Sequence, residues 1–108
     1  MSVSILIRRG NETIEDMPLS NQPFITETYV PAAEQLRLSW LPLIIRAAGL
    51  VVDAANKNEV IAELGRMDEN AHRHLRHSKV GFVLSVNQKI RAAILEKMTE
   101  DDISLDIA

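Results

Sequence analysis

The sequence predicts a mostly α-helical protein: a small bundle of three or four helices with an extended N-terminal arm, completed by dimerisation. Three observations support this fold class. The chain has 108 residues, which is the length of a single domain. Aromatic residues make up only 4% of the chain, so Leu, Ile, Val and Ala must form the core. From residue 31 onward, apolar residues recur mainly at helical spacing.

The N-terminal region predicts an extended arm, which we assign to residues 1–30. Apolar residues alternate with others from Val3 to Ile7, which is the pattern of a short strand. Gly10-Asn11 then provides a turn that leads the chain back through residues 12–15 as a hairpin. Two prolines with nearby Ser and Asn residues mark a loop after it.

Residues 31–98 are predicted to form the helical domain, whose first helix begins at Pro31, a residue suited to a first helical turn. Pro42 either kinks this helix or lies in the first turn of a new one that Ser39 caps. Apolar side chains surround the segment from Leu36 to Ala55 on most sides. A helix of this kind must be covered on several sides, so it becomes the predicted centre of the bundle.

Two further helices are expected after this central one. The second begins near Asn56 with Glu59 in the capping-box position, and the third begins at Ser85 with Gln88 in the same position. Residues 99–108 form an acidic tail, which adds a capped turn or frays. The apolar faces are predicted to be Val60, Leu64, Met67, Ala71 and Leu75 in the second helix, and Val86, Ile90, Ala93, Ile94 and Met98 in the third.

The central helix carries more apolar surface than two neighbouring helices can cover. A second copy of the chain or another protein is the economical cover, and we expect self-association. Trp residues are enriched at the centre of protein-binding surfaces, and Trp40 lies in this segment. Burial in the core of a single chain is the alternative explanation for Trp40 and its apolar neighbours. The residues predicted for this partner or dimer interface are Leu36, Trp40, Leu43, Ile44, Ala47 and Val51.

The composition limits the chemistry and the location of the protein. There are no cysteines, which excludes disulfides, thiolate metal sites and cysteine catalysis. The apolar run at the N-terminus is too short for a secretory signal, and basic residues follow it. The apolar stretch Trp40–Ala55 is interrupted by polar residues, whereas a membrane span needs about 20 predominantly apolar residues. We therefore expect a cytoplasmic protein without a membrane partner.

Neither catalysis nor a cofactor is expected from the motifs. The serines lack the context of an activated nucleophile, and there is no glycine-rich loop for phosphates. A metal site is the weaker alternative at the histidine cluster, where only His74 and His77 have the spacing that brings two imidazoles to one side of a helix. A solvated, partly basic helix face is the better explanation of these histidines. The sequence therefore predicts a non-enzymatic protein.

A helix-turn-helix DNA-binding regulator is the main alternative function, with residues 59–79 as the motif. Basic residues concentrate in this part of the chain, and Gly65 stands where such a motif ends its first helix. Arg66 and Ile61 depart from the pattern, and one continuous helix through Gly65 is the competing interpretation. The residues predicted to contact nucleic acid are Asn70, Arg73, Arg76 and Lys79.

Part of the predicted helical domain resembles a known family. The residues that carry the likeness are Val30-Pro31-Ala32-Ala33-Glu34-Gln35-Leu36, Leu43, Ala47-Ala48 and Asp53-Ala54-Ala55. Over residues 30–75 the chain resembles a family of small helical bacterial proteins, and its size and two-helix layout are similar to those of quorum-sensing antiactivators. The resemblance implies a homodimer that binds the ligand-binding domain of a LuxR-type transcription activator and keeps it from engaging DNA. It implies no catalytic or cofactor residues.

Overall fold

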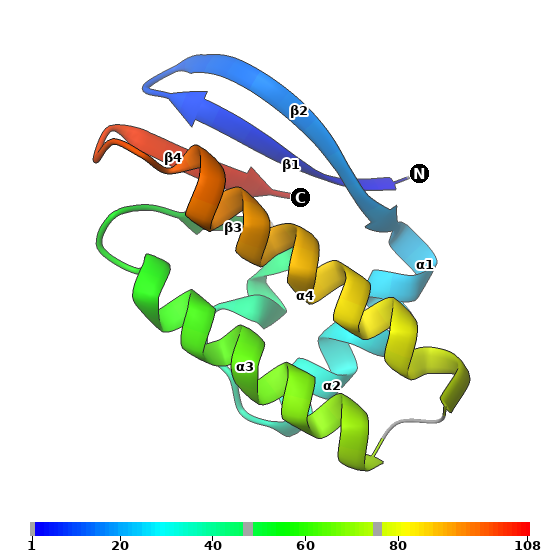
Figure 1. The fold of residues 1–108 in the computed structure, drawn as a ribbon. Helices are drawn as coiled ribbons and strands as arrows, with labels where there is room; N and C mark the ends of the chain where they lie inside the picture. The colour runs from blue at the N-terminus through cyan, green and yellow to red at the C-terminus, as the bar shows by residue number, and fades with distance from the viewer. Residues whose placement is uncertain (1, 47–48, 75–76) are drawn as a thin grey trace.

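The computed structural model describes residues 2–46, 49–74 and 77–108, apart from the side chains of residues 77 and 78. It has two layers: a four-stranded antiparallel sheet, and helices that pack on one face of this sheet (Figure 1). The prediction of a mostly α-helical bundle is therefore wrong, because the fold is α+β. The strands come from both ends of the chain and from the segment predicted as the central helix.

The sheet joins the two ends of the chain. β1 (Ser2–Arg9) and β2 (Glu12–Asn21) form a hairpin that turns at Gly10-Asn11, as predicted. β1 pairs on its other side with β4 (Ile103–Ile107), and β3 (Leu50–Val52) completes the strand order β2-β1-β4-β3. The residues assigned to an arm and to an acidic tail thus lie side by side in one sheet (Figure 1).

Alternation of residue types decides which face of the sheet the helices cover. Every second residue of β1 and β4 is buried, while the residues between them are partly exposed on the opposite face. On this solvated face, Arg8 Nη1 lies 3.1 Å from Asp106 Oδ2 on the neighbouring strand. An antiparallel sheet with one covered face has this pattern. The buried set consists of Val3, Ile5, Ile7, Ile103, Leu105 and Ile107.

Side chains restrict strand pairing at both edges of the sheet. At the β3 edge, the buried Asn56 donates its Nδ2–H to the Val51 carbonyl at 2.9 Å. At the β2 edge, Pro18 has no N–H to offer, and the Leu19 carbonyl accepts a hydrogen bond from Lys89 Nζ at 3.1 Å. Because occupied or missing backbone groups disfavour the addition of another strand, we do not expect two copies to pair through their sheets.

One helical run lies earlier in the chain than predicted. It consists of α1 (Gln22–Phe24), the π-helical turn η1 (Ile25–Tyr29) and α2 (Val30–Gln35), which follow one another without a break. Pro31, predicted to start the first helix, lies inside α2. π-helical turns inside longer helical runs are frequent at functional sites, which directs attention to this part of the molecule.

The predicted central helix from Leu36 to Ala55 is wrong. Arg37 has a positive φ of 57°, and α2 ends before it. The chain then forms the short 3₁₀ helix η2 (Leu41–Ile45), with Pro42 in its first turn, before it enters β3. At the entry to β3, Gly49 adopts a φ of 74°, which a residue with a side chain rarely adopts.

Several apolar residues of the predicted central helix are covered within a single chain. Leu41, Ile44, Leu50 and Val52 belong to the segment that was predicted to need an outside cover, and all four are buried within one chain. The segment divides its apolar residues between a 3₁₀ helix and a strand, and both elements contribute to the common core. No partner is required to cover them.

The two long helices pack against each other and carry most of the helical core. α3 (Lys57–His74) runs through Gly65 without interruption, so the turn that a helix-turn-helix motif would need at this residue is absent. α4 (His77–Lys97) begins well before Ser85, where its start was predicted. The predicted apolar faces are confirmed, because all of their described residues are buried; Leu75 lies outside the described residues. The proximity of α3 and α4 is visible in Figure 1.

A helix that crosses a bilayer must be long and predominantly apolar. Within residues 2–46, 49–74 and 77–108, no helix combines the length and the apolar content that crossing a bilayer requires.

Candidate functional site

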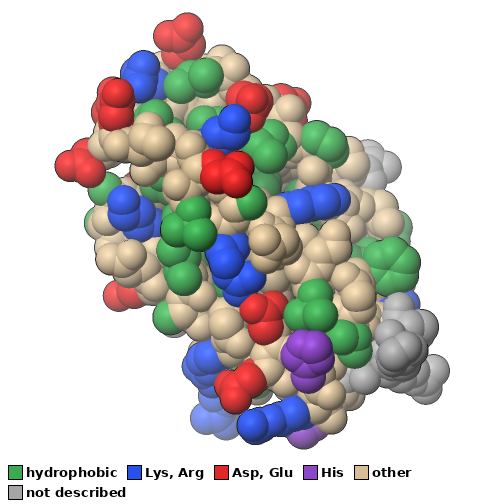
Figure 2. All heavy atoms as spheres, in the orientation of Figure 1, with side chains coloured by type: hydrophobic (Ala, Val, Ile, Leu, Met, Phe, Trp, Pro, Cys, Tyr) green, Lys and Arg blue, Asp and Glu red, His purple; other side chains and the backbone are tan. Residues whose placement is uncertain are grey.

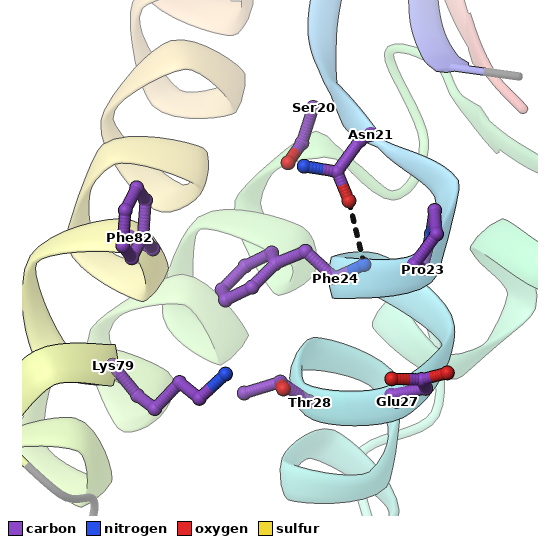
Figure 3. Close-up of a pocket in the computed structure, with 8 residues that line it drawn as sticks. All are labelled: Ser20, Asn21, Pro23, Phe24, Glu27, Thr28, Lys79 and Phe82. Atoms are coloured by element: carbon purple, nitrogen blue, oxygen red, sulfur yellow. Dashed lines mark hydrogen bonds between the residues drawn. The ribbon is translucent and has the colours of Figure 1, made fainter.

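A pocket of about 290 Å³ opens between the end of β2, the helical run of α1 and η1, and the N-terminal half of α4 (Figure 3). Its two walls come from distant parts of the chain, which the fold brings together. We call it the aromatic pocket because two phenylalanine rings, tilted against each other, form part of its lining. Its lining consists of Ser20, Asn21, Pro23, Phe24, Glu27, Thr28, Lys79 and Phe82.

The local sequence holds one of the two rings in position. Asn21 is the N-cap of α1, and its Oδ1 accepts the backbone N–H of Phe24 at 2.8 Å. Pro23 occupies the first turn of the helix, where its fixed φ suits the backbone. In Figure 3 the Phe24 side chain extends from this capped turn toward α4. The cap and the proline therefore set the direction from which Phe24 enters the pocket.

The second ring is supplied by α4 and remains open to solvent. Phe82 is 64% exposed, whereas Val83, its neighbour in the chain, is fully buried. The ring centroids of Phe24 and Phe82 are 5.8 Å apart and their planes are tilted by 56°. Tilted aromatic pairs at this separation attract each other beyond the burial of their area. The pair thus forms a rigid apolar surface that is in place before anything binds.

Polar groups border the aromatic pair on its other sides. Figure 3 shows the Lys79 side chain reaching across the pocket toward Thr28, and the Ser20 hydroxyl at the opposite end. Glu27 lies on the far side of the η1 turn from Lys79 in the same view. The pocket therefore combines an apolar surface with a cation and hydroxyl groups, the mixture typical of specific binding sites.

A network of buried and partly buried polar groups joins η1, which contributes to one wall of the pocket, to α4, which contributes to the other. The Tyr29 hydroxyl of η1 donates to Asn87 Oδ1 of α4. Asn87 Nδ2 donates to Asp68 Oδ1 of α3 at 2.7 Å, and Arg91 Nη2 donates to Asp68 Oδ2 at 2.6 Å. These bonds join η1, which directly follows Phe24 in the chain, to α3 and to α4, which carries Phe82. They therefore restrict the separation of the two rings.

Burial raises the pKa of Tyr29 above its ordinary value of 10.0, and the negative charge of Asp68 raises it further, while Arg91 acts in the opposite direction. The folded protein therefore keeps this hydroxyl protonated at a pH where the unfolded chain ionises it. By linkage, the contribution of Tyr29 to stability is complete below about pH 10 and is lost as the pH rises above it.

An alkaline titration is expected to show this directly, because Tyr29 is the sole tyrosine. The ultraviolet absorbance of tyrosinate should stay low while circular dichroism reports a folded chain, and should rise only together with unfolding. In concentrated urea the same absorbance should appear with a midpoint near 10. Tyrosinate absorbance with that ordinary midpoint in the folded protein would contradict the buried network.

The six residues predicted as a partner or dimer interface do not share one surface. Ile44 is buried, and Val51 is exposed on the solvated face of the sheet. Ala47 lies outside the described residues. The half-buried members, which pack against the core, are Leu36, Trp40 and Leu43.

Trp40 is held in place by two glutamates of α3. Its indole Nε1–H donates to Glu59 Oε2 at 2.9 Å. The Glu63 carboxylate accepts the backbone N–H groups of Ser39, Trp40 and Leu41 at 3.0–3.1 Å, and so caps the start of η2. The tryptophan that was predicted as a binding anchor therefore has a structural role within the chain.

Of the residues predicted to contact nucleic acid, the structure describes Asn70, Arg73 and Lys79, which lie toward the end of α3 and the start of α4. Asn70 and Arg73 line a hollow of about 180 Å³ beside α3, while Lys79 lines the aromatic pocket. Arg76 lies outside the described residues. At the end of the face seen in Figure 2, histidine and basic side chains come together beside acidic ones. Arg73 itself lies 3.4 Å from Glu69.

Only one member of the predicted metal-binding pair, His74 and His77, has a described side chain. His74 is exposed at the end of α3, and the side chain of His77 lies outside the described residues. Among the side chains that the structure describes, no group of three or more His, Asp or Glu residues is placed to hold a metal ion. No site residue is assigned to a metal here.

The aromatic pocket was missed at the level of the sequence for an identifiable reason. The third helix was predicted to begin at Ser85, which left Phe82 in a loop. A single apolar residue in a loop cannot be compared with the buried face of a helix. With α4 beginning at His77, Phe82 lies beside the buried Val83 and Val86 but outside their stripe. A large aromatic residue outside the buried stripe of an amphipathic helix is the signal that identifies it.

Comparisons with known proteins assign no family to the chain. A scan against models of protein families, a search of curated proteins and a search of solved structures each found no match. Its function is therefore inferred from its own residues and their geometry.

Proposed function

We propose that this protein is a protein-binding module, which captures an apolar side chain of its partner in the aromatic pocket. The main observation behind the proposal is the exposed ring of Phe82, which contacts Phe24 in a tilted arrangement beside a pocket of about 290 Å³. An apolar cavity of about 150 Å³ holds a benzene molecule, so this pocket has room for a large side chain.

The energetics favour an apolar anchor at this place. Full burial of a phenylalanine side chain stabilises a complex by roughly 1.5–3 kcal/mol, and most of the Phe82 side chain is still exposed in the free chain. The cap at Asn21 orders the backbone turn before Phe24, and the network around Asn87 holds α4 in place, so the backbone of both walls is ordered before binding. Aromatic residues in such preformed surfaces are frequent centres of protein interfaces.

The narrower role of a homodimeric antiactivator of a LuxR-type activator stays a prediction. It drew on a resemblance to helical proteins over residues 30–75, and within that range Leu41–Ile45 and Leu50–Val52 form a 3₁₀ helix and a strand instead of a long helix. A protein-binding module of the present kind needs neither that helix nor a second copy. The search for its partner starts in the cytoplasm, the compartment that the sequence predicts.

Photo-crosslinking in the native cells tests the proposal with a matched control. The photoreactive residue p-benzoylphenylalanine is introduced at Phe82 or at Leu95, which is equally exposed at 66% but lies near the other end of α4. We expect a discrete adduct with one partner protein from position 82 that position 95 does not give. The adduct should disappear when Phe24→Ser is added to the position 82 variant.

Identical adducts from both positions, or adducts from position 82 that survive Phe24→Ser, would show that the aromatic pocket is not the binding site. We expect Phe24→Ser to keep its fold, because Phe24 is only partly buried. Circular dichroism of each variant checks this.

A further inference from the structure

The aromatic pocket is one end of a longer groove. A second hollow of about 290 Å³ shares Glu27, Thr28 and Lys79 with the aromatic pocket and continues along α2 to His74. A third hollow, of about 180 Å³, shares His74 with the second and continues to Arg66 on α3. We use the term groove for these three adjoining hollows.

The dimensions of the groove suit an extended peptide. One side is formed by the helical run from Gln22 to Gln35, which at about 1.5 Å per residue extends for roughly 20 Å. An extended segment of about six residues, at roughly 3.3 Å each, has the same length. The partner can thus follow the whole groove while one of its side chains enters the aromatic pocket.

The charges along the groove differ from those of the chain as a whole. The chain carries a net charge of −3, yet Lys79, Arg73 and Arg66 line the groove, against Glu27 and Glu69. Among the described residues, Lys79 and Arg66 form no ion pair with a carboxylate. Arg66 Nη2 donates to the Leu36 carbonyl at 3.2 Å, which leaves the other N–H groups of its guanidinium for a ligand. Lys79 and these N–H groups can therefore pair with an acidic ligand.

We propose that the groove binds an extended acidic segment of the partner protein, with a large apolar side chain in the aromatic pocket and carboxylates at Lys79 and Arg66. This inference rests on the proposed function and names the chemistry of the ligand. Carboxylates next to Lys or Arg make charge-assisted hydrogen bonds, which are the stronger class. A single-stranded nucleic acid is the less favoured ligand, because sites for single strands combine a strongly positive groove with aromatic side chains for successive bases. This groove has one aromatic pair, and Glu27 and Glu69 lie beside its three cations.

Selection from a library of random linear peptides, each about ten residues long, tests the ligand chemistry on the full chain. We expect the recovered peptides to contain an aromatic or large aliphatic residue with two or more Asp or Glu residues within about six positions of it. Binding of a recovered peptide, measured by fluorescence anisotropy, should weaken as salt is added. An unlabelled oligothymidylate of similar length should not displace it.

Two charge-reversal variants separate a local effect from a general one. Lys79→Glu is expected to weaken binding of the recovered peptide about tenfold or more. Lys57→Glu changes the net charge equally but lies at the opposite end of α3 from His74, and it should leave the affinity within about twofold. Circular dichroism confirms that both variants are folded.

Several outcomes overturn the inference. Recovered peptides that are basic or uncharged, equal losses from both variants, or displacement by the oligothymidylate would each refute an acidic peptide ligand. If uncharged peptides are recovered and their binding still depends on Phe82, the protein-binding module stands and only the charge of its ligand was wrong. Failure of the crosslinking at position 82 would refute the proposed function itself.

Discussion

The Asn87→Leu variant is expected to lose roughly 3–5 kcal/mol of its free energy of unfolding. Asn87 is fully buried and bonds to Tyr29 and to Asp68 at once. Leucine has a similar size but can neither accept from the tyrosine hydroxyl nor donate to the carboxylate. Each buried polar group left unpaired costs about 1–3 kcal/mol, and more where it is charged. Urea unfolding followed by the fluorescence of Trp40 measures the loss.

A second substitution shows how much of this loss belongs to the network. Tyr29→Phe removes the hydroxyl alone, so adding it to Asn87→Leu should recover about 1 kcal/mol or more of the loss, because one unpaired group disappears. A loss below about 1 kcal/mol for Asn87→Leu would mean that the network does not hold η1, α3 and α4 together. The rigid placement of Phe24 against Phe82 would then need another explanation.

The Gly49→Ala variant is expected to lose about 3 kcal/mol, far more than the same change at Gly10. Both glycines have a positive φ, of 74° and 61°, which costs an alanine roughly 1–2 kcal/mol. A methyl group at Gly49 would lie 2.6 Å from the carbonyl oxygen of Ile107 and 2.7 Å from Cβ of Ala108. At Gly10 it would meet nothing within 4 Å. The difference therefore measures the close approach of β3 to β4.

Urea unfolding of the two variants side by side gives this comparison, with Gly10→Ala losing about 1 kcal/mol as the matched control. Equal losses from both substitutions would show that the chain does not approach β4 closely at Gly49. In that case the entry into β3, which replaces the predicted central helix, would be incorrectly placed.

Some features of the candidate site could be predicted from the sequence, and others could not. Asn21 followed by Pro23 is a recognisable helix start, and Phe82 becomes conspicuous once α4 is taken back to His77. The contact between Phe24 and Phe82 was not predictable, because no local pattern shows that the turn after β2 lies against the first half of α4. The basic residues were noticed as a group, but the groove that contains Lys79 and Arg73 depends on how α2 packs beside them.

Local residue patterns were sufficient to predict the hairpin and the buried faces of the two long helices. The turn at Gly10-Asn11 specified the hairpin, and the spacing of apolar residues specified the buried faces of α3 and α4. These elements make their backbone hydrogen bonds within a helix or to a neighbouring strand, so local residues are sufficient to define them.

The secondary structure of residues 36–55 and of the C-terminal tail depends on contacts with distant parts of the chain. A segment that is apolar on nearly every side satisfies a buried helix and a buried strand equally well, and its periodicity does not distinguish them. Leu50 to Val52 form a strand because β4 offers hydrogen-bonding partners, and β4 lies between β3 and β1, strands from distant parts of the chain. The alternation at Ile103, Leu105 and Ile107 was present in the sequence, but an isolated strand has no stability of its own, and its partners are supplied only by the folded chain.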